Sequence, residues 1–113
     1  MKLVLNTWLA FQAEGAAESA ALAEGFGLQP EDLLAALRGN PLASDYALAK
    51  LGRMVERDYR VDFSLDWALK DLDLVGAEAP GTAPVASAIA DRWRELVRAG
   101  WGGSDVSAAR NGL

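Results

Sequence analysis

The chain has 113 residues, of which 51% are hydrophobic, and a formal net charge of −5. This length and apolar content suffice to bury the core of one folded domain. Cysteine and histidine are both absent, which excludes disulfides, cysteine-ligated metals and the commonest zinc ligand and general base. An acidic chain without a Lys/Arg cluster lacks the charge pattern of nucleic-acid or membrane-surface binding. We therefore expect no metal, nucleic acid or membrane partner, and a cytoplasmic location.

The first predicted element is one long helix over residues 2–24, which a Gly-Phe-Gly stop signal ends. At 1.5 Å per residue it would be roughly 35 Å long. Polar residues interrupt its apolar opening, so we expect a mature helix and no signal peptide. Its polar edge is narrow and consists of Thr7, Glu14 and Glu18, while the remainder is apolar or alanine. Such a pattern predicts a central helix that is buried on nearly all sides.

Four shorter helices follow, separated by glycine and proline. Pro30 opens the second, Ser44 or Asp45 caps the third, Ser64 caps the fourth, and Pro84 lies at the start of the fifth. The residues of the fifth helix expected to face inward are Val85, Ile89, Trp93 and Leu96. No run of alternating residues is long enough for a sheet. The sequence thus predicts one all-α domain over residues 1–113, a helical bundle around one long central helix.

Two sets of residues are candidates for chemistry. Lys2 and Asn6 are four residues apart and therefore share one face of the first helix, at the edge of an apolar surface. A lysine there can transfer a proton, and an amide can orient a carboxylate or a carbonyl group. On spacing alone, the simpler interpretation is that Lys2 is a solvated residue at a helix end.

Lys70 lies away from the apolar stripe of the fourth helix, on the side of Asp66. An ordinary i,i+4 ion pair with Asp66, contributing about 0.3–0.5 kcal/mol, accounts for it without any function. Trp67 is also off the stripe, and we interpret it as facing a partner. The glycine clusters at 25–27 and 100–103 follow helices, whereas a dinucleotide-binding loop follows a strand.

Four segments, taken in order, resemble motifs of the β-hydroxyacid dehydrogenase family, which includes 3-hydroxyisobutyrate dehydrogenase and, more distantly, 6-phosphogluconate dehydrogenase. Lys2-Leu3-Val4-Leu5-Asn6 is similar to the family's K-x-x-x-N. Residues 18–28 resemble E-A-x-x-L-A-x-x-x-G-L, residues 62–72 resemble F-x-L-x-L-x-x-K-D-L, and residues 100–108 resemble the closing G-x-G-D-x-D-x-S-A. Gly103 departs from the last motif, because it replaces the motif's first aspartate. Imine reductases share the architecture but usually lack a lysine at the position of Lys2.

The resemblance implies an enzyme of two domains, whose N-terminal Rossmann half binds NAD or NADP and whose C-terminal half is this helical domain. It implies that Lys2 is the catalytic proton donor and acceptor, that Asn6 binds the substrate, and that Lys70 reaches the cofactor. The substrate would be a small hydroxy acid such as 3-hydroxyisobutyrate, and the helical halves would pair as a homodimer. We expect these 113 residues to be inactive without the Rossmann half. The alternative is a non-enzymatic helical module for dimerisation or partner binding.

Overall fold

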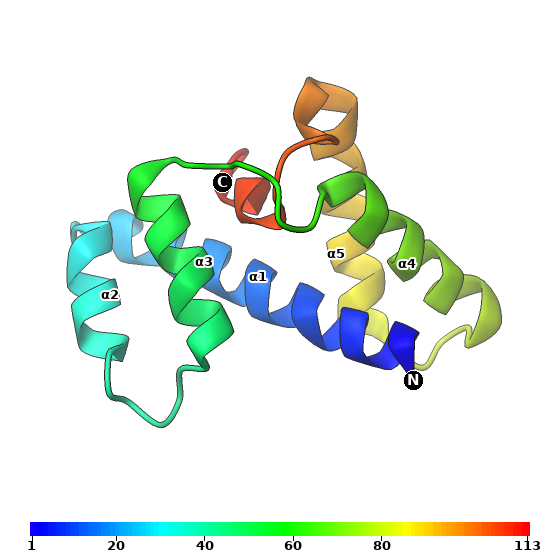
Figure 1. Cartoon of the computed structure of the whole chain (residues 1–113), viewed down its shortest axis with the longest axis horizontal. Helices are drawn as coiled ribbons and strands as arrows, with labels where there is room; N and C mark the ends of the chain where they lie inside the picture. The colour runs from blue at the N-terminus through cyan, green and yellow to red at the C-terminus, as the bar shows by residue number, and fades with distance from the viewer.

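The computed structural model describes all 113 residues and contains five α-helices and two short helical turns, with no sheet (Figure 1). The helices are α1 (Lys2–Gly25), α2 (Pro30–Leu37), α3 (Asp45–Glu56), α4 (Leu65–Glu78) and α5 (Pro84–Leu96), and the turns are η1 (Val97–Trp101) and η2 (Val106–Arg110). The first helix contacts every other α-helix and η2. The predicted all-α bundle around one long helix is confirmed.

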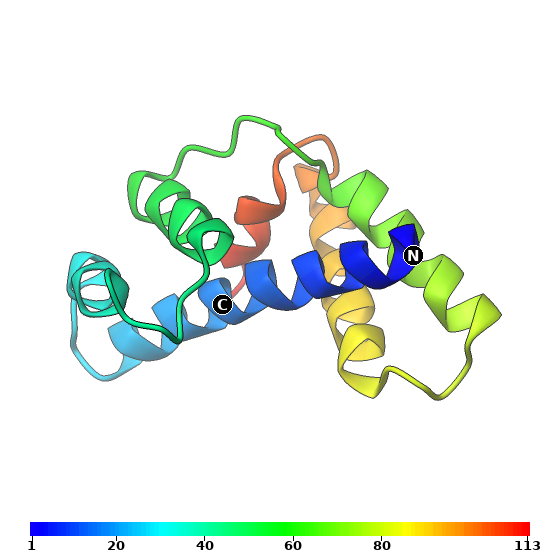
Figure 2. The ribbon, with the colours of Figure 1, turned by 60° about the horizontal axis from the view of Figure 1, so that its bottom comes forward.

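The other elements are arranged along the length of α1. Figures 1 and 2 show α2 and α3 beside its C-terminal half, α4 and α5 beside its N-terminal half, and the C-terminal segment between the two pairs. A helix of 24 residues is about 36 Å long, close to the 39 Å longest dimension of the molecule. None of the helices is both long and apolar enough to cross a membrane.

The predicted helix starts at Ser44 and Ser64 are confirmed, because both side chains cap a helix. The Ser44 hydroxyl accepts a hydrogen bond from the N–H of Ala47 at 3.0 Å, and the Ser64 hydroxyl accepts one from the N–H of Trp67 at 3.2 Å. These caps satisfy backbone donors that have no partner within the helix. After α5 the chain turns away at Gly100, whose φ of 101° lies in a region that residues with a Cβ rarely adopt.

The buried face of α1 consists of alanines and one glutamate, Glu14. Ala10, Ala13 and Ala17 have no accessible surface, so neighbouring elements approach the helix closely. Another part of the helix surface is not covered: Val4, at 65%, and Trp8, at 63%, are mostly exposed. Our expectation of burial on nearly all sides is therefore wrong for the single chain, since its other elements cover one face only.

Of the four residues of α5 that we expected to face inward, three are buried. Ile89, Trp93 and Leu96 are buried in the core, whereas Val85 is 63% exposed. Val85 lies in the first turn of α5, beside the uncovered face of α1, and both line one apolar groove. Because no other part of the chain packs over this groove, both the face of α1 and Val85 are more exposed than predicted.

Glu14 is buried, although the sequence places it on the polar edge of α1. Arg92 of α5 donates two hydrogen bonds to its carboxylate, at 2.6 and 2.7 Å, and the indole N–H of Trp93 donates a third at 2.7 Å. Burial alone would raise the pKa of Glu14, but these hydrogen bonds hold that pKa below its usual value. The charge is therefore paired inside the core, and it joins the middle of α1 to α5.

Replacing Glu14 by glutamine should destabilise the domain, because Arg92 would lose its charged partner and keep only neutral acceptors such as backbone carbonyls. We expect Glu14→Gln to lower the free energy of unfolding by about 2–4 kcal/mol, measured by urea denaturation. The control Glu95→Gln breaks an ion pair with Arg98 on the surface and should change stability by less than about 1 kcal/mol. Equal effects of the two substitutions would contradict a special role for the buried pair.

Candidate functional site

Lys2 and Asn6, on the first two turns of α1, meet at the carboxylate of Asp71 on α4. The Asn6 amide Nδ2 donates a hydrogen bond to Asp71 Oδ2 at 2.7 Å, and the Lys2 Nζ lies 3.8 Å from Asp71 Oδ1. Asp71 is only 6% exposed, whereas the side chain of Lys2 is 77% exposed. The two predicted site residues are therefore brought together by a third that the sequence analysis gave no role.

The contact with Asp71 fixes which way the Asn6 amide points. An ionised carboxylate only accepts hydrogen bonds, so the amide must turn its NH₂ group toward Asp71. Its carbonyl oxygen is then left to accept a hydrogen bond from a ligand. Beside it stands the exposed ammonium of Lys2, which has three donors. This arrangement suits a hydroxyl or carbonyl group that gains or loses a proton.

Lys70 lies next to Asp71 in α4 but contacts neither Lys2 nor Asn6. Its ammonium lies over the indole ring of Trp67, 4.9 Å from the ring centre. The ion pair with Asp66 considered above does not form, and Lys70 takes part in no other ion pair. Trp67 is 59% exposed, in agreement with its prediction as a residue outside the core.

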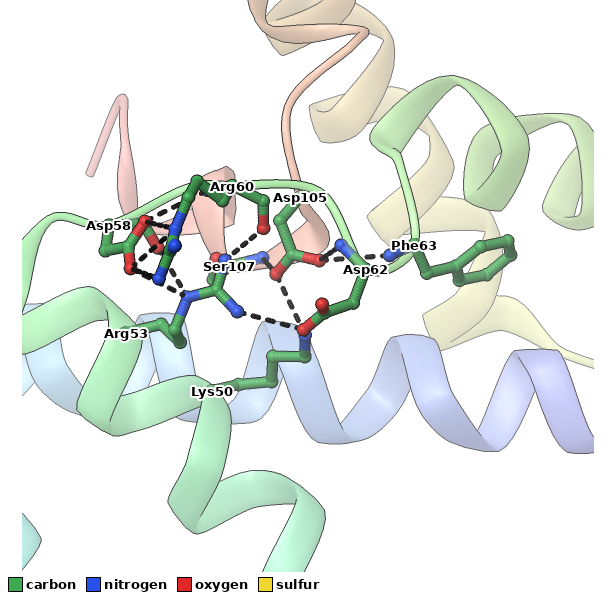
Figure 3. A network of polar contacts seen from close by, with 8 residues as sticks. All are labelled: Lys50, Arg53, Asp58, Arg60, Asp62, Phe63, Asp105 and Ser107. Atoms are coloured by element: carbon green, nitrogen blue, oxygen red, sulfur yellow. Dashed lines mark hydrogen bonds and ion pairs between the residues drawn. The ribbon is translucent and has the colours of Figure 1, made fainter.

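A buried network fixes the start of α4, and it is centred on Lys50 of α3 and Asp105 (Figure 3). The Lys50 ammonium lies 2.9 Å from Asp105 Oδ2 and 3.3 Å from Asp62 Oδ2. The other oxygen, Asp105 Oδ1, accepts hydrogen bonds from the backbone N–H groups of Asp62 and Phe63, at 3.0 and 3.1 Å. Asp105 also caps η2, since its Oδ2 accepts from the N–H of Ser107 at 3.0 Å.

Backbone hydrogen bonds extend this network to the first turn of α4. The N–H of Leu65 donates to the carbonyl of Ser104 at 3.0 Å, and the N–H of Asp66 donates to the carbonyl of Gly102 at 2.9 Å. Because helix N–H groups at this end have no partner within the helix, the C-terminal segment completes the beginning of α4. The position of Asp71, fewer than two turns further on, follows from that attachment.

The roles of Asp71 and Lys50 and the burial of Asp105 were not predicted from the sequence. Lys50 did carry a signal: it lies between Ala47 and Met54 on the inward stripe of α3, where an unpaired lysine is rarely found. Asp71 carried none beyond its place after Lys70, and Asp105 appeared only within the closing motif of residues 100–108. No group of three or more acidic side chains lies close enough together to hold a metal ion.

Stability in acid should depend on Asp105. Burial alone would raise the pKa of Asp105, but hydrogen bonds from Ser107, the N–H of Asp62 and Lys50 hold that pKa below its usual value. A carboxylate whose pKa is lower in the folded state stabilises the fold above its unfolded pKa, about 3.9, and loses this contribution as the pH falls further.

We therefore expect Asp105→Asn to lower the free energy of unfolding by about 3 kcal/mol at pH 7. The stability of this variant should also depend less steeply on pH between about 5 and 2 than that of the parent. Urea denaturation at a series of pH values measures both effects. Asp91→Asn removes an exposed carboxylate that forms no ion pair, and it should leave the pH dependence unchanged. The assignment would be refuted if the stability of Asp105→Asn changed with pH as steeply as that of the parent.

A bundle of five helices built on one long helix is the fold of the helical domain of β-hydroxyacid dehydrogenases. The chain belongs to this family. Residues 1–112 match the family model described as "NAD-binding of NADP-dependent 3-hydroxyisobutyrate dehydrogenase". The family predicted from the four sequence motifs is thereby confirmed.

Two solved dehydrogenases have a domain of the same shape. The 3-hydroxyisobutyrate dehydrogenase of Salmonella typhimurium superposes with a TM-score of 0.89 at 24% identity, over 99% of this chain and 40% of that one. The 3-hydroxyisobutyrate dehydrogenase of Mycobacterium tuberculosis, solved with L-serine, gives a TM-score of 0.80 at 27% identity, over 96% of this chain and 40% of that one. The chain thus corresponds to less than half of each enzyme.

Two curated relatives carry a different name. The chain is 30% identical to the cytokine-like nuclear factor N-PAC of Anopheles gambiae over 111 residues, and 30% identical to that of Aedes aegypti over 113 residues. The matches cover 96% of this chain and 20% of each relative. The same helical domain therefore also occurs in proteins whose names do not describe a dehydrogenase.

Proposed function

We propose that this chain is the substrate-binding and dimerisation half of an NAD(P)-dependent oxidoreductase that acts on a small hydroxy acid such as 3-hydroxyisobutyrate. The observation that carries the proposal is the cluster of Lys2, Asn6 and Asp71. An exposed ammonium stands beside an amide that a buried carboxylate orients, at the edge of the domain. A domain that served only for assembly would have no need of this arrangement.

Within this cluster each residue has a distinct task. Lys2 donates a proton to, or accepts one from, the oxygen of the substrate that alternates between hydroxyl and carbonyl. Asn6 accepts a hydrogen bond from the substrate hydroxyl through its free carbonyl oxygen. Asp71 holds both side chains by their nitrogen atoms, which makes it a positioning residue.

The exposed side chains of this site suit the nicotinamide end of a dinucleotide cofactor. Lys2 and Lys70 are exposed cations, and Lys70 has no carboxylate partner, so both suit the anionic and carbonyl groups of a cofactor and its substrate. The pyrophosphate normally needs a strand, a glycine loop and a helix, and the chain forms no strand. We therefore assign the glycine loop that cradles the pyrophosphate to a nucleotide-binding half other than these 113 residues. When bound, the dinucleotide supplies or accepts the hydride.

Lys2 is the residue to test first, in a polypeptide that joins this chain to a nucleotide-binding half, such as that of the Mycobacterium tuberculosis enzyme. We expect Lys2→Ala to lower kcat by about 10²–10⁴-fold, while NAD(P)H still binds. Lys2→Arg keeps the positive charge but cannot release its proton at neutral pH, so it should be equally impaired. Substantial activity in either variant would exclude proton transfer by Lys2. The 113-residue chain alone should show no turnover.

We also propose that the chain forms a homodimer through the uncovered face of α1. Val4, Trp8 and Val85, each more than 60% exposed, border an apolar groove of about 750 Å³ between the start of α1 and the start of α5. Contiguous apolar surface of this kind is uncommon on a monomer and marks an interface. A second copy that presents the same face would bury it.

Sedimentation equilibrium tests the dimer directly. We expect the chain to sediment at twice its mass of 12.0 kDa, and Trp8→Asp to convert it to a monomer. Val61→Asp is the matched control, since Val61 is 56% exposed but lies outside the groove, and it should remain dimeric. A monomeric parent protein at micromolar concentration would rule the interface out.

The second candidate function is a non-enzymatic assembly or partner-binding module, which the matches to the two insect nuclear factors favour. Both candidates use the same apolar face of α1, so dimerisation does not separate them. Activity of the fusion to a nucleotide-binding half separates the two candidates, because only a dehydrogenase half would give turnover that depends on Lys2.

A further inference from the structure

Trp67 and Lys70 form a pair that the reaction described above does not explain. The two residues are three apart on α4, a spacing that brings side chains together on a helix surface. The ammonium lies 4.9 Å from the centre of the indole, within the range in which a cation is attracted by the face of an aromatic ring. Both side chains are exposed, so the pair borders solvent and is not part of the core.

No carboxylate pairs with the charge of Lys70, although Asp66, Asp71 and Asp73 all lie within four residues of it on α4. The carboxylate of Asp66 lies against Gly102, so closely that a Cβ on that glycine would overlap it. Asp71 is bound by Asn6 and Lys2. On the next turn, Asp73 pairs with Arg94 of α5 at 2.9 Å. An uncompensated cation therefore stands over an aromatic ring, next to the proposed site.

The position of the ring connects it to that site. Trp67 and Asp71 are four residues apart and share one face of α4, and Asp71 is the residue that Lys2 and Asn6 contact. Trp67 is the only aromatic residue of α4. A leucine in its place would have no π-face and could not attract an ammonium in this way.

We propose that Trp67 is a positioning residue, which holds the ammonium of Lys70 over its indole and so presents an unneutralised cation to the carboxylate or phosphate group of a ligand bound beside Asp71. This inference rests on the proposed function, because it concerns a ligand of the same site. The ring confines a flexible side chain before the ligand arrives, so less conformational freedom is lost on binding. The attraction at an exposed site corresponds to about twofold to fivefold in a binding constant.

The test uses the 113-residue chain itself and NMR, so it does not depend on turnover. Without ligand, the Lys70 side-chain methylene signals should be shifted upfield by the ring current of Trp67, and Trp67→Leu should abolish the shift. The chain is then titrated with 3-hydroxyisobutyrate and, separately, with inorganic pyrophosphate. We expect Trp67→Leu to weaken binding of the preferred anion by about twofold to fivefold, and Trp67→Phe to restore part of it.

Two further variants separate positioning from general effects. Lys70→Met should weaken binding of the preferred anion more than Trp67→Leu does, since it removes the cation itself. Trp8→Leu removes an equally exposed tryptophan that has no cation over its ring, and it should bind like the parent. Tighter binding of 3-hydroxyisobutyrate assigns the cation to the substrate carboxylate, and tighter binding of pyrophosphate assigns it to the cofactor.

The proposal is overturned if the Lys70 methylene signals of the parent are unshifted, if neither anion binds, or if Trp67→Leu binds as tightly as the parent. The failure of the proposed function would look different. In that case a Lys2 variant of the fusion would keep its activity, while the ring-current shift and the anion binding at Lys70 would be unaffected.

Discussion

The buried ion pair of Lys50 and Asp105 is the interaction on which the rest of the structure depends. A fully buried carboxylate is tolerated only when its charge and its hydrogen-bonding capacity are both satisfied. Here one ammonium and three backbone N–H groups surround Asp105. These partners come from α3, from the segment before α4 and from the start of η2, so three distant parts of the chain must meet at one point. The pair therefore constrains topology, whatever its net contribution to stability.

That constraint sets the direction of α4 and, with it, the candidate site. The C-terminal segment bonds to the backbone at the start of α4, and Ser64 caps the same turn. From this fixed origin, α4 carries Trp67, Lys70 and Asp71 to the first turns of α1. The site thus combines residues that are 65 positions apart in the sequence, and its geometry is determined by a network that contains none of the proposed catalytic groups.

The long helix α1 serves both the core and the surface. Its alanine face lets α3, α4 and α5 approach closely, and the buried Glu14 ties it to Arg92 and Trp93. Its opposite face keeps large apolar side chains that a single chain does not cover. Contiguous apolar surface of this kind marks an interaction site, which links the long helix of the fold to the proposed dimer.

The sequence by itself determined the helices, their capping residues and the family. These features depend on local rules: hydrophobic periodicity, serine at helix starts, and short motifs in a fixed order. It also placed Lys2 and Asn6 on one face, because their spacing alone decides that. Only the tertiary structure decided that Glu14 and Asp105 are buried, that Asp71 joins Lys2 to Asn6, and that Lys70 lies over Trp67 and not beside Asp66. The burial of Glu14 and Asp105 and the role of Asp71 depend on which distant side chain neutralises a charge, and local sequence carries no record of residues that meet across 42 to 79 positions. Lys70 and Trp67 are three residues apart, but their spacing does not say which of two nearby side chains, Asp66 or Trp67, the ammonium contacts.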